Sequence, residues 1–385
     1  MTALLDSSRA ADSGNVAIMT TPAAYGGLEK VTVELVRGLH RVGRRTLLVA
    51  VLDFGTLEPA WISELRDNGA DIVVLRIVGR DYLGEYRAIR RILAERNIGV
   101  VHTHGYRADL IHARAARSLG IATVSTVHGF TGKGTKGRLY EWLQCRALRW
   151  FDAVVPVSRP LVERLIDSGV PSTKLHLIPN GMPSVRDDFV SRAAARKALG
   201  LPPTGTIVGW VGRVSGEKGP DIVIKSMEHL PSTIALCLVG DGPELANTQT
   251  LAASLNLASR VHFAGAVPNA SQLFLAFDLL ALSSRTEGTP MVLMEAAAAR
   301  VPIIATAVGG VPDLIGLNGG WLVPSEDPNA LGKAMRHALD NPIEASARTS
   351  QLLSQLQLRA SADEWIDRYD QLYRAVSARG ASGQP

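Results

Sequence analysis

Short runs of apolar and β-branched residues alternate with amphipathic stretches along the whole chain, and this alternation restricts the fold more than any other feature. Successive strands separated by helix-length stretches pair in parallel, because a parallel crossover needs roughly a dozen residues or more. The sequence therefore predicts βα units and parallel sheets. The strands expected in the first half span residues 15–22, 45–53, 71–77, 99–104, 122–129, 153–158 and 174–180.

The chain changes character near its middle. Residues 182–206 contain prolines, a charged helical stretch at 191–199 and no strand run, which predicts a connection between two domains. The fold class is thus predicted as α/β with two Rossmann-like domains. A second series of strands is expected at 206–212, 234–240, 261–265, 279–284, 302–307 and 320–324. The expected organisation is a tail at 1–14, an N-terminal domain at 15–185, a linker at 186–202, a C-terminal domain at 203–360 and a terminal helix at 361–378.

Composition places the chain among globular proteins, since 46% of its 385 residues are hydrophobic and 20% are charged. No run reaches the roughly 18 apolar residues of a membrane-spanning helix, and residues 1–14 lack the basic and apolar parts of a secretory signal. Cys145 and Cys237 have no metal-ligand spacing around them and are predicted to be reduced core residues. We therefore expect a cytoplasmic protein.

Charge is unevenly distributed between the two halves. Residues 1–190 carry 25 Lys and Arg against 19 Asp and Glu, whereas residues 191–385 carry 16 against 17. A basic N-terminal half suits an acidic partner such as a phospholipid surface, a lipid diphosphate or a nucleic acid. The charge alone does not choose among these three.

The segment at 283–300, with the sequence SSRTEGTPMVLMEAAAAR, is the most informative part of the chain. Thr289 is the expected N-cap and Pro290 the expected first residue of a helix. Glu287 precedes that helix and Glu295 falls in its second turn, so both carboxylates can face one cavity. The free N–H groups of the first turn, including those near Gly288, make the same place attractive to phosphate.

Two further glycine-rich loops follow strands of the C-terminal half. The loop at 212–219 carries Arg213 and Lys218, and two cations above a sheet edge match a diphosphate. The turn Gly240-Asp241-Gly242 lets backbone approach a ligand closely. It is not a complete dinucleotide fingerprint, because Leu245 replaces the final glycine of G-x-G-x-x-G.

In the N-terminal half, the pair Gly26-Gly27 opens a helix after the first strand, and His102, His104 and His128 lie at strand ends. Ligands of open α/β sheets bind at the carboxyl ends of strands. A cleft between the domains is therefore predicted, with glycines and histidines on one wall and Arg, Lys and Glu on the other. Each feature also has a structural interpretation, in which the glycines form a turn, the histidines are satisfied strand ends and the cations lie on a solvated loop.

Taken in order, these motifs resemble glycosyltransferase family 4, and the resemblance covers nearly all of the chain. It rests on GGLEKVTVEL, VVHTHG, TVHGF, VSRPLVERL, LIPNG, VGRVSGEKG, VGDGPE, the E-x7-E pair Glu287 and Glu295, and VGGVPD. Departures from the family pattern are Met182-Pro183 after the Asn-Gly pair, Asp313 in place of a common Glu, and Gly99 before the VVH strand.

The resemblance implies the GT-B fold, with two Rossmann-like domains facing across a cleft and a terminal helix that crosses back onto the first domain. It implies a metal-independent reaction that retains anomeric configuration by front-face attack, without Glu287 as a covalent nucleophile. In such enzymes, residues matching Arg213 and Lys218 hold the donor diphosphate, together with backbone amides at Gly26-Gly27 and Gly288–Pro290. Residues matching Glu287, Glu295 and His128 contact the donor sugar, the ribose and the transferred sugar, and the turn at Gly240–Gly242 lines the nucleoside side.

The acceptor side is less determined. His102 and His104 are candidates for it, and the acceptor is expected to be a sugar, a lipid-linked molecule or another small molecule. Basic residues between Lys133 and Arg149 alternate with Leu and Trp residues, including Trp142 and Trp150. One interpretation is a core-facing helix with a solvated basic side, and the other is a peripheral contact with the inner face of an anionic membrane.

The predicted function is transfer of a sugar from a nucleotide diphosphate sugar to a hydroxyl acceptor in polysaccharide or glycolipid synthesis, with no cofactor, no metal and no nucleic-acid partner. A nucleotide-sugar epimerase or hydrolase of the same fold and a non-catalytic sugar-nucleotide-binding subunit remain alternatives. A nicotinamide-dependent oxidoreductase, suggested by Asp53 at a strand end, is disfavoured by the incomplete glycine pattern.

Overall fold

The computed structural model describes residues 15–22, 26–130, 134–182, 189–359 and 361–382. Contacts divide the chain into two compact units. Unit 1 comprises Met1–Gly181 and Ala362–Pro385, and unit 2 comprises Met182–Ser361. Among the described residues, no helix is both long and apolar enough to cross a bilayer.

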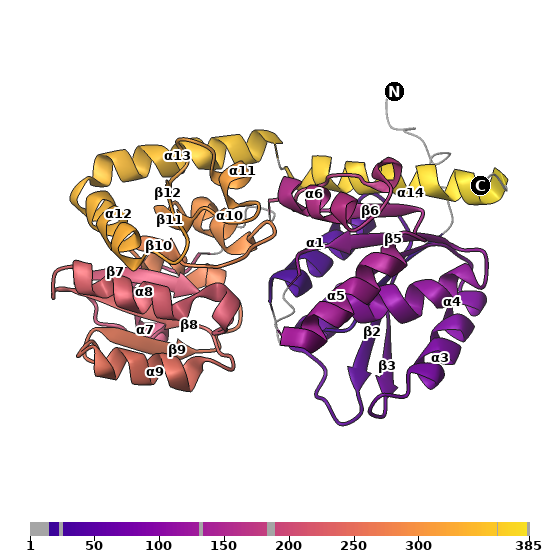
Figure 1. Cartoon of the computed structure of the whole chain (residues 1–385), viewed down its shortest axis with the longest axis horizontal. Coiled ribbons are helices and arrows are strands. Elements are labelled where there is room, and N and C mark those ends of the chain that lie inside the picture. The colour runs from indigo at the N-terminus through magenta and orange to yellow at the C-terminus, as the bar shows by residue number, and fades with distance from the viewer. Residues whose placement is uncertain (1–14, 23–25, 131–133, 183–188, 360, 383–385) are drawn as a thin grey trace. The chain divides into compact units, whose positions relative to one another are not determined.

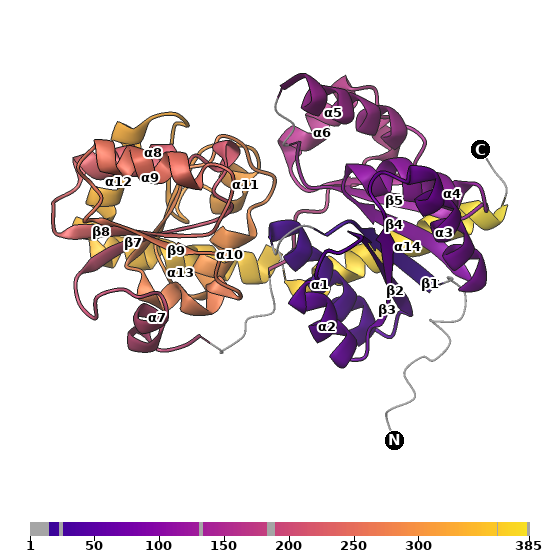
Figure 2. The ribbon, with the colours of Figure 1, turned by 90° about the horizontal axis from the view of Figure 1, so that it is seen from below.

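Unit 1 is a six-stranded parallel sheet of order β3-β2-β1-β4-β5-β6 with helices on both faces (Figures 1 and 2). Its strands are β1 Asn15–Thr20, β2 Thr46–Asp53, β3 Asp71–Ile77, β4 Ile98–His104, β5 Ala122–Val127 and β6 Ala153–Pro156. Its helices are α1 Gly27–Arg41, α2 Ala60–Asp67, α3 Tyr82–Glu95, the π-helix η1 Ala108–His112, α4 Ala113–Arg117, α5 Gly134–Leu148, α6 Arg159–Asp167, the 3-10 helix η2 Ser172–Lys174 and α14 Ala362–Ser382.

Unit 2 is a second six-stranded parallel sheet, of order β12-β11-β10-β7-β8-β9. Its strands are β7 Thr206–Val211, β8 Ile234–Val239, β9 Val261–Gly265, β10 Leu279–Leu282, β11 Ile303–Thr306 and β12 Trp321–Val323. Its helices are α7 Arg192–Ala198, α8 Pro220–Ser226, α9 Leu245–Ser254, α10 Met291–Ala298, α11 Val311–Ile315, α12 Pro328–Asp340, α13 Pro342–Arg359 and the 3-10 helices η3 Gly216–Lys218, η4 Met227–His229 and η5 Ala270–Ala276.

The strands form because the sequence supplies apolar runs that can be buried on both faces. In β2 the six residues from Leu47 to Leu52 are all buried, and β10 and β11 are buried throughout. Such continuous runs are typical of parallel sheets that carry helices on both sides. In both units the strand order reverses at the first strand, at β1/β4 and at β7/β10, as in Rossmann-like folds. The predicted α/β fold with two Rossmann-like units is confirmed.

One predicted strand is wrong. Residues 174–180 run beside β6 but make a single bridge, between Val154 and Leu175, and His176 N donates to Val154 O at 2.9 Å. Ile178 N also donates to Pro156 O at 3.2 Å, but Pro156 has no N–H with which to donate back, so a regular ladder does not form. The segment instead brings the chain towards the end of unit 1 at Gly181.

The terminal helix α14 belongs to unit 1 by its contacts. One apolar face of the helix is buried, and it consists of Trp365, Ile366, Tyr369, Leu372, Tyr373 and Val376. Ile366 lies against α1 at Gly38, where a Cβ atom would come within 2.2 Å of the Ile366 Cδ1 atom. Asp370 pairs with Arg44, which follows α1, and Tyr373 Oη lies 2.7 Å from His102 Nδ1 of β4. The prediction that the terminal helix returns to the first domain is confirmed.

The exact domain boundaries, including a linker at 186–202, stay predictions. Within that range the structure describes α7, which packs against η5 of unit 2. Its buried Arg196 donates to Ala276 O at 3.1 Å and pairs with Asp278. The predicted tail at 1–14 lies outside the described residues.

Candidate functional site

The reversal of strand order in unit 2 brings two loops together at one point of the sheet edge. Strands β7 and β10 are neighbours, and the loops that leave their carboxyl ends carry Lys218 and Glu287. Because β7 and β10 send their crossover helices in opposite directions along the sheet, a crevice is expected between these loops, and ligands of doubly wound sheets bind in such crevices.

Lys218 and Glu287 form a direct ion pair at this point. The Lys218 ammonium nitrogen lies 2.7 Å and 2.8 Å from the two carboxylate oxygens of Glu287. Ser284 Oγ donates to the same carboxylate at 2.6 Å, and the Glu287 side chain is only 5% exposed. An ammonium group has three protons and the carboxylate accepts two of them, so the third can donate to a phosphate oxygen. Glu287 therefore holds the Lys218 ammonium group in one place.

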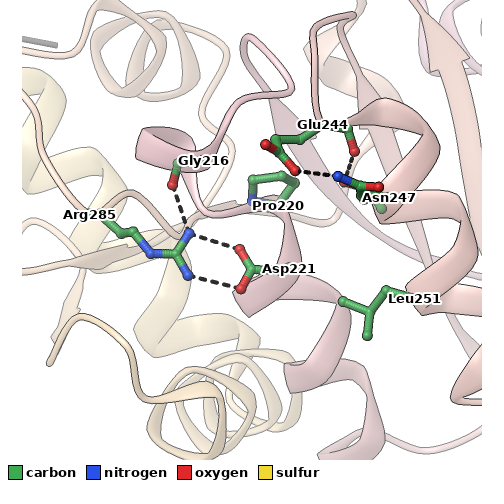
Figure 3. A pocket seen from close by; sticks show the side chains of 8 residues that line it. Gly216, Pro220, Asp221, Glu244, Asn247, Leu251 and Arg285 are labelled. Carbon is green, nitrogen blue, oxygen red and sulfur yellow. Dashed lines mark hydrogen bonds and ion pairs between the residues drawn. The ribbon is translucent and has the colours of Figure 1, made fainter. Parts of the chain in front are cut away.

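Arg285 fixes the turn that carries Lys218. Its guanidinium group donates to Asp221 through two hydrogen bonds of 2.8 Å and to Gly216 O at 2.7 Å, as Figure 3 shows. Its backbone N–H donates to Glu217 O at 2.8 Å, and its side chain also pairs with Glu326. A planar guanidinium group with several fixed donors can bridge these groups at once, which a lysine cannot do. The β10–α10 loop and the Lys218 turn are thus joined into one rigid unit.

The turn Gly240-Asp241-Gly242 packs on the loop that carries Arg213. Val214 N donates to Asp241 O, and Gly212 N donates to Val239 O. A Cβ atom on Gly240 would lie 1.8 Å from Gly212 O, and one on Gly242 would lie 2.3 Å from Val214 O, so both positions require glycine. Arg213 and Asp241 are exposed on these two loops.

A second close backbone contact supports Glu287 from the other side. Gly309, with φ +53°, lies so near the Glu287 carbonyl that a Cβ atom would be 1.8 Å from its oxygen. Next to it, Gly310 N donates to Gly288 O at 2.9 Å. The β11–α11 turn therefore determines where the Glu287–Gly288 backbone can lie.

Helix α10 begins one residue later than predicted. Pro290, rather than Thr289, is its N-cap, with φ −73° and ψ 116°, and the helix begins at Met291. The reason is that Pro290 keeps an extended ψ, so the first helical residue follows it. Glu295 lies in the second turn as predicted and is 7% exposed, and Thr289 and Gly288 are also buried.

In unit 1 the predicted residues lie along the carboxyl edge of the sheet. Gly26 is the N-cap of α1, in an extended conformation, and Gly27 is the first helical residue. Residues 23–25 of the same loop lie outside the described residues. His104 ends β4, and His128 follows β5.

The three histidines differ in their surroundings. His102 is fully buried, with Nδ1 2.7 Å from Tyr373 Oη and Nε2 2.7 Å from Thr126 Oγ1, and burial lowers its pKa to about 3. His104 Nδ1 lies 3.0 Å from His128 Nε2, and burial likewise lowers the pKa of both residues. Among the described residues, His104 Nε2 has no hydrogen-bond partner. His102 is thus a structural link between α14 and β5, while His104 and His128 form a neutral pair at the sheet edge.

Unit 1 also buries two carboxylates that the sequence did not single out. Asp109 accepts hydrogen bonds from Thr103, Ser125 and Gln144 and has no cation beside it among the described residues, and burial raises its pKa to about 6. Glu85 is instead paired with Arg107 and lies 2.7 Å from His112 Nε2, and these contacts lower the pKa of its carboxyl below the usual range despite burial. Both stabilise the π-helix η1 behind the edge.

In the part of the chain that the structure describes, no group of three or more His, Cys, Asp or Glu residues could hold a metal ion. The residues that the sequence reasoning missed are Ser284, Arg285, Gly309 and Gly310. Gly309 and Gly310 belong to the VGGVPD motif, but the sequence did not show that they contact the Glu287–Gly288 backbone and fix its position.

Two α/β units, each with the strand order of a Rossmann-like fold, and a terminal helix that returns to the first unit define the GT-B class of fold. The structure of Anabaena HepE in complex with UDP-glucose has this fold, with a TM-score of 0.83 and 18% identity, over 94% of this chain and 100% of that chain. Sucrose-phosphate synthase from Thermosynechococcus elongatus is similar, with a TM-score of 0.78 and 22% identity, over 94% of this chain and 99% of that chain.

Family models match both units. Residues 26–181 match the glycosyl transferase 4-like domain, and residues 191–352 match the glycosyl transferases group 1. The chain therefore belongs to the group 1 glycosyltransferases, family 4, with a family-4-like N-terminal domain.

Two curated relatives illustrate the likeness. A D-inositol 3-phosphate glycosyltransferase of Xylanimonas cellulosilytica is 29% identical over 257 residues, which is 60% of this chain and 61% of that protein. The putative teichuronic acid biosynthesis glycosyltransferase TuaC of Bacillus subtilis is 38% identical over 248 residues, 59% of this chain and 60% of that protein. The chain thus covers less than two thirds of the length of either relative.

Proposed function

We propose that this protein is a retaining glycosyltransferase that moves a hexose from a nucleoside diphosphate sugar to a hydroxyl acceptor, in the synthesis of a polysaccharide or a glycolipid. The observation that carries the proposal is the Lys218–Glu287 ion pair at the strand-order reversal of unit 2, with Ser284 and Arg285 holding it in place. Membership of a retaining family supports transfer over the epimerase, hydrolase and binding-subunit alternatives.

In this proposal the donor diphosphate binds at the Lys218 turn. The free proton of the Lys218 ammonium group and the exposed guanidinium group of Arg213 stabilise the charge that grows on the departing nucleoside diphosphate. Removing one such group typically costs about 3 to 4 kcal/mol of barrier. The pair with Glu287 fixes the ammonium group before the donor arrives, so little reorganisation is needed.

Glu287 has a second role in the proposal. With one oxygen held by Ser284 and both held by Lys218, its carboxylate has lone pairs left that can accept from hydroxyl groups of the donor sugar. Glu295, buried in the second turn of α10, is assigned to the ribose, and the Gly240–Gly242 turn to the nucleoside side. Gly26, Gly27, Gly288 and Thr289 are proposed to donate backbone N–H groups to the donor molecule. Pro290 has no N–H and is proposed to contact the donor through its ring, and His128 is proposed to contact the transferred sugar.

UDP is the proposed nucleotide, because HepE was crystallised with UDP-glucose and shares the fold. The relatives named for D-inositol 3-phosphate and teichuronic acid support a sugar or polyol hydroxyl as acceptor. A cytoplasmic location is part of the proposal, and it is supported by the two buried, unpaired cysteines. His102 is a poor acceptor contact because both of its ring nitrogens are already hydrogen-bonded.

A screen of nucleotide sugars, each with and without candidate sugar, polyol and lipid-linked acceptors, tests this function. The proposal expects release of nucleoside diphosphate that depends on an acceptor, together with a new glycosidic bond of the same anomeric configuration as the donor. Free sugar without acceptor would indicate a hydrolase, a changed nucleotide sugar would indicate an epimerase, and an inverted product would contradict retention.

A further inference from the structure

Two neighbouring strands of unit 1 bring histidines to one point of its carboxyl edge. His104 ends β4 and His128 follows β5, and these strands are paired with His104 beside Thr126. The two imidazole rings are stacked, with centres 5.3 Å apart and an angle of 23° between their planes. His104 Nδ1 lies 3.0 Å from His128 Nε2, which is hydrogen-bond distance. One of these two nitrogens therefore carries a proton, and the other accepts the hydrogen bond.

Both rings are neutral at neutral pH. Burial lowers the pKa of His128 to about 4 and the pKa of His104 well below its ordinary value. The ring of His102 is centred 4.3 Å from that of His104, and a charge on one ring disfavours a charge on its neighbour. A neutral imidazole has one protonated nitrogen and one bare nitrogen, so fixing the state of one nitrogen also fixes the other.

The surroundings of His104 Nε2 determine the direction of the hydrogen bond. This nitrogen is buried, and within the residues that the structure describes it has no hydrogen-bond partner. A proton on Nε2 would be a buried N–H donor without an acceptor, whereas a bare Nε2 leaves only a lone pair unused. Buried donors without a partner are rarer in folded proteins than buried acceptors with unused lone pairs. The favoured state of His104 therefore has a bare Nε2 and a proton on Nδ1.

We propose that His104 is a positioning residue that fixes the tautomer of His128. His104 Nδ1 donates to His128 Nε2, so His128 must carry its own proton on Nδ1. Within the described part of the chain, His128 Nδ1 makes no hydrogen bond, and the His128 side chain is only partly buried. Its N–H group is therefore available to a ligand at the carboxyl edge of the sheet, where ligands of such folds bind.

This role of His104 rests on the proposed function and adds to it the chemistry of His128. A ring nitrogen that already carries a proton donates to an oxygen and cannot take a proton from the acceptor hydroxyl. In the proposed transfer the acceptor oxygen bonds to the anomeric carbon, the bond from that carbon to the diphosphate breaks, and the hydroxyl proton goes to the departing diphosphate. His128 donates to an oxygen of the transferred sugar and is not the general base.

The tautomers can be measured directly in the full-length protein without any substrate. In protein labelled with ¹⁵N-histidine, NMR correlation spectra at neutral pH separate protonated from bare ring nitrogens, and single variants assign the signals among the nine histidines. In the wild type, His104 and His128 should each have a protonated Nδ1 and a bare Nε2. In His104→Leu, His128 should no longer be held in one tautomer, whereas His40→Leu, at an exposed position near the end of α1, should change nothing. A proton on Nε2 of His104 in the wild type would overturn the proposal.

The rate of sugar transfer tests whether this hydrogen bond contributes to the reaction. His104→Asn keeps an amide N–H donor near the position of Nδ1, whereas His104→Leu fills the space without a donor. Loss of one hydrogen bond corresponds to roughly a tenfold change, so kcat/KM should fall about tenfold in His104→Leu and stay within about threefold of wild type in His104→Asn. Equal losses in the two variants, or a normal rate in His104→Leu, would overturn the positioning role. Absence of sugar transfer by the wild type would contradict the proposed function alone, because the NMR spectra still determine the direction of the hydrogen bond.

Discussion

Replacing Gly309 with alanine should separate the β11–α11 turn from the loop that carries Glu287. The new Cβ atom would lie 1.8 Å from the Glu287 carbonyl oxygen, and contacts under 3.0 Å essentially do not occur, so the two backbones must part by at least 1.2 Å (3.0 minus 1.8). The positive φ of +53° adds roughly 1 to 2 kcal/mol of backbone strain for alanine. Because a displacement of about 1 Å in a catalytic group can cost about 100-fold, we expect kcat/KM to fall about 100-fold.

The assay is the initial rate of nucleoside diphosphate release with the donor and acceptor found in the screen, together with the midpoint of thermal unfolding. Gly205→Ala is the matched control. Gly205 also has a positive φ, +96°, but a Cβ atom there meets nothing within 4 Å, and it precedes β7 at the opposite edge of the sheet. That variant should lose stability and keep its activity. Equal activity losses in the two variants would refute the positioning role of the Gly309 turn.

Two further substitutions test the hydrogen bonds around Arg285 and Asp109. Arg285→Ala should lower kcat/KM for the donor at least tenfold, because the Lys218 turn loses the hydrogen bonds that Arg285 makes with Asp221 and Gly216. Arg285→Lys should restore little of this loss, since a lysine cannot bridge both groups. A normal rate in both variants would show that the Lys218 turn keeps its position without Arg285. Burial raises the pKa of Asp109 from its ordinary value of 3.8 to about 6, so the folded protein binds this proton more tightly than the unfolded chain does. The stabilisation from Asp109 is therefore present below pH 4 and is lost as the pH rises through 6. Chemical denaturation of wild type and Asp109→Asn at pH 4 and pH 7 should give free-energy differences that change by about 2 kcal/mol in this direction, and a pH-independent difference would contradict the assignment.

The strands of both sheets could be predicted because a parallel sheet with helices on both faces needs continuous apolar runs, and twelve of the expected runs form strands. The segment at 174–180 runs beside β6 but forms only one bridge with it, because Pro156 of β6 has no N–H to complete the ladder, and the sequence of the segment itself does not show which strand it will meet. The predicted N-cap, Thr289, was wrong by one residue, because Pro290 has an extended ψ and is itself the N-cap.

The sequence predicted which loops form the candidate site, but it did not predict the contacts between their side chains. Carboxyl ends of parallel strands share an edge, so Lys218 and Glu287 were expected near one another, yet their ion pair depends on the neighbouring positions of β7 and β10. Arg285 was missed because an arginine on a loop resembles a solvated charge until its partners are known. His102 had the right position in sequence, but its partner Tyr373 lies 271 residues further along the chain.

The most direct test of the central claim is the rate of sugar transfer by Lys218→Ala and Glu295→Ala, compared with wild type at saturating acceptor. Both side chains are assigned to the donor rather than to the core, so both variants should lose most transfer while circular dichroism and the unfolding midpoint show an intact fold. Near-normal transfer by both variants would contradict the assignment of the unit 2 crevice as the donor site.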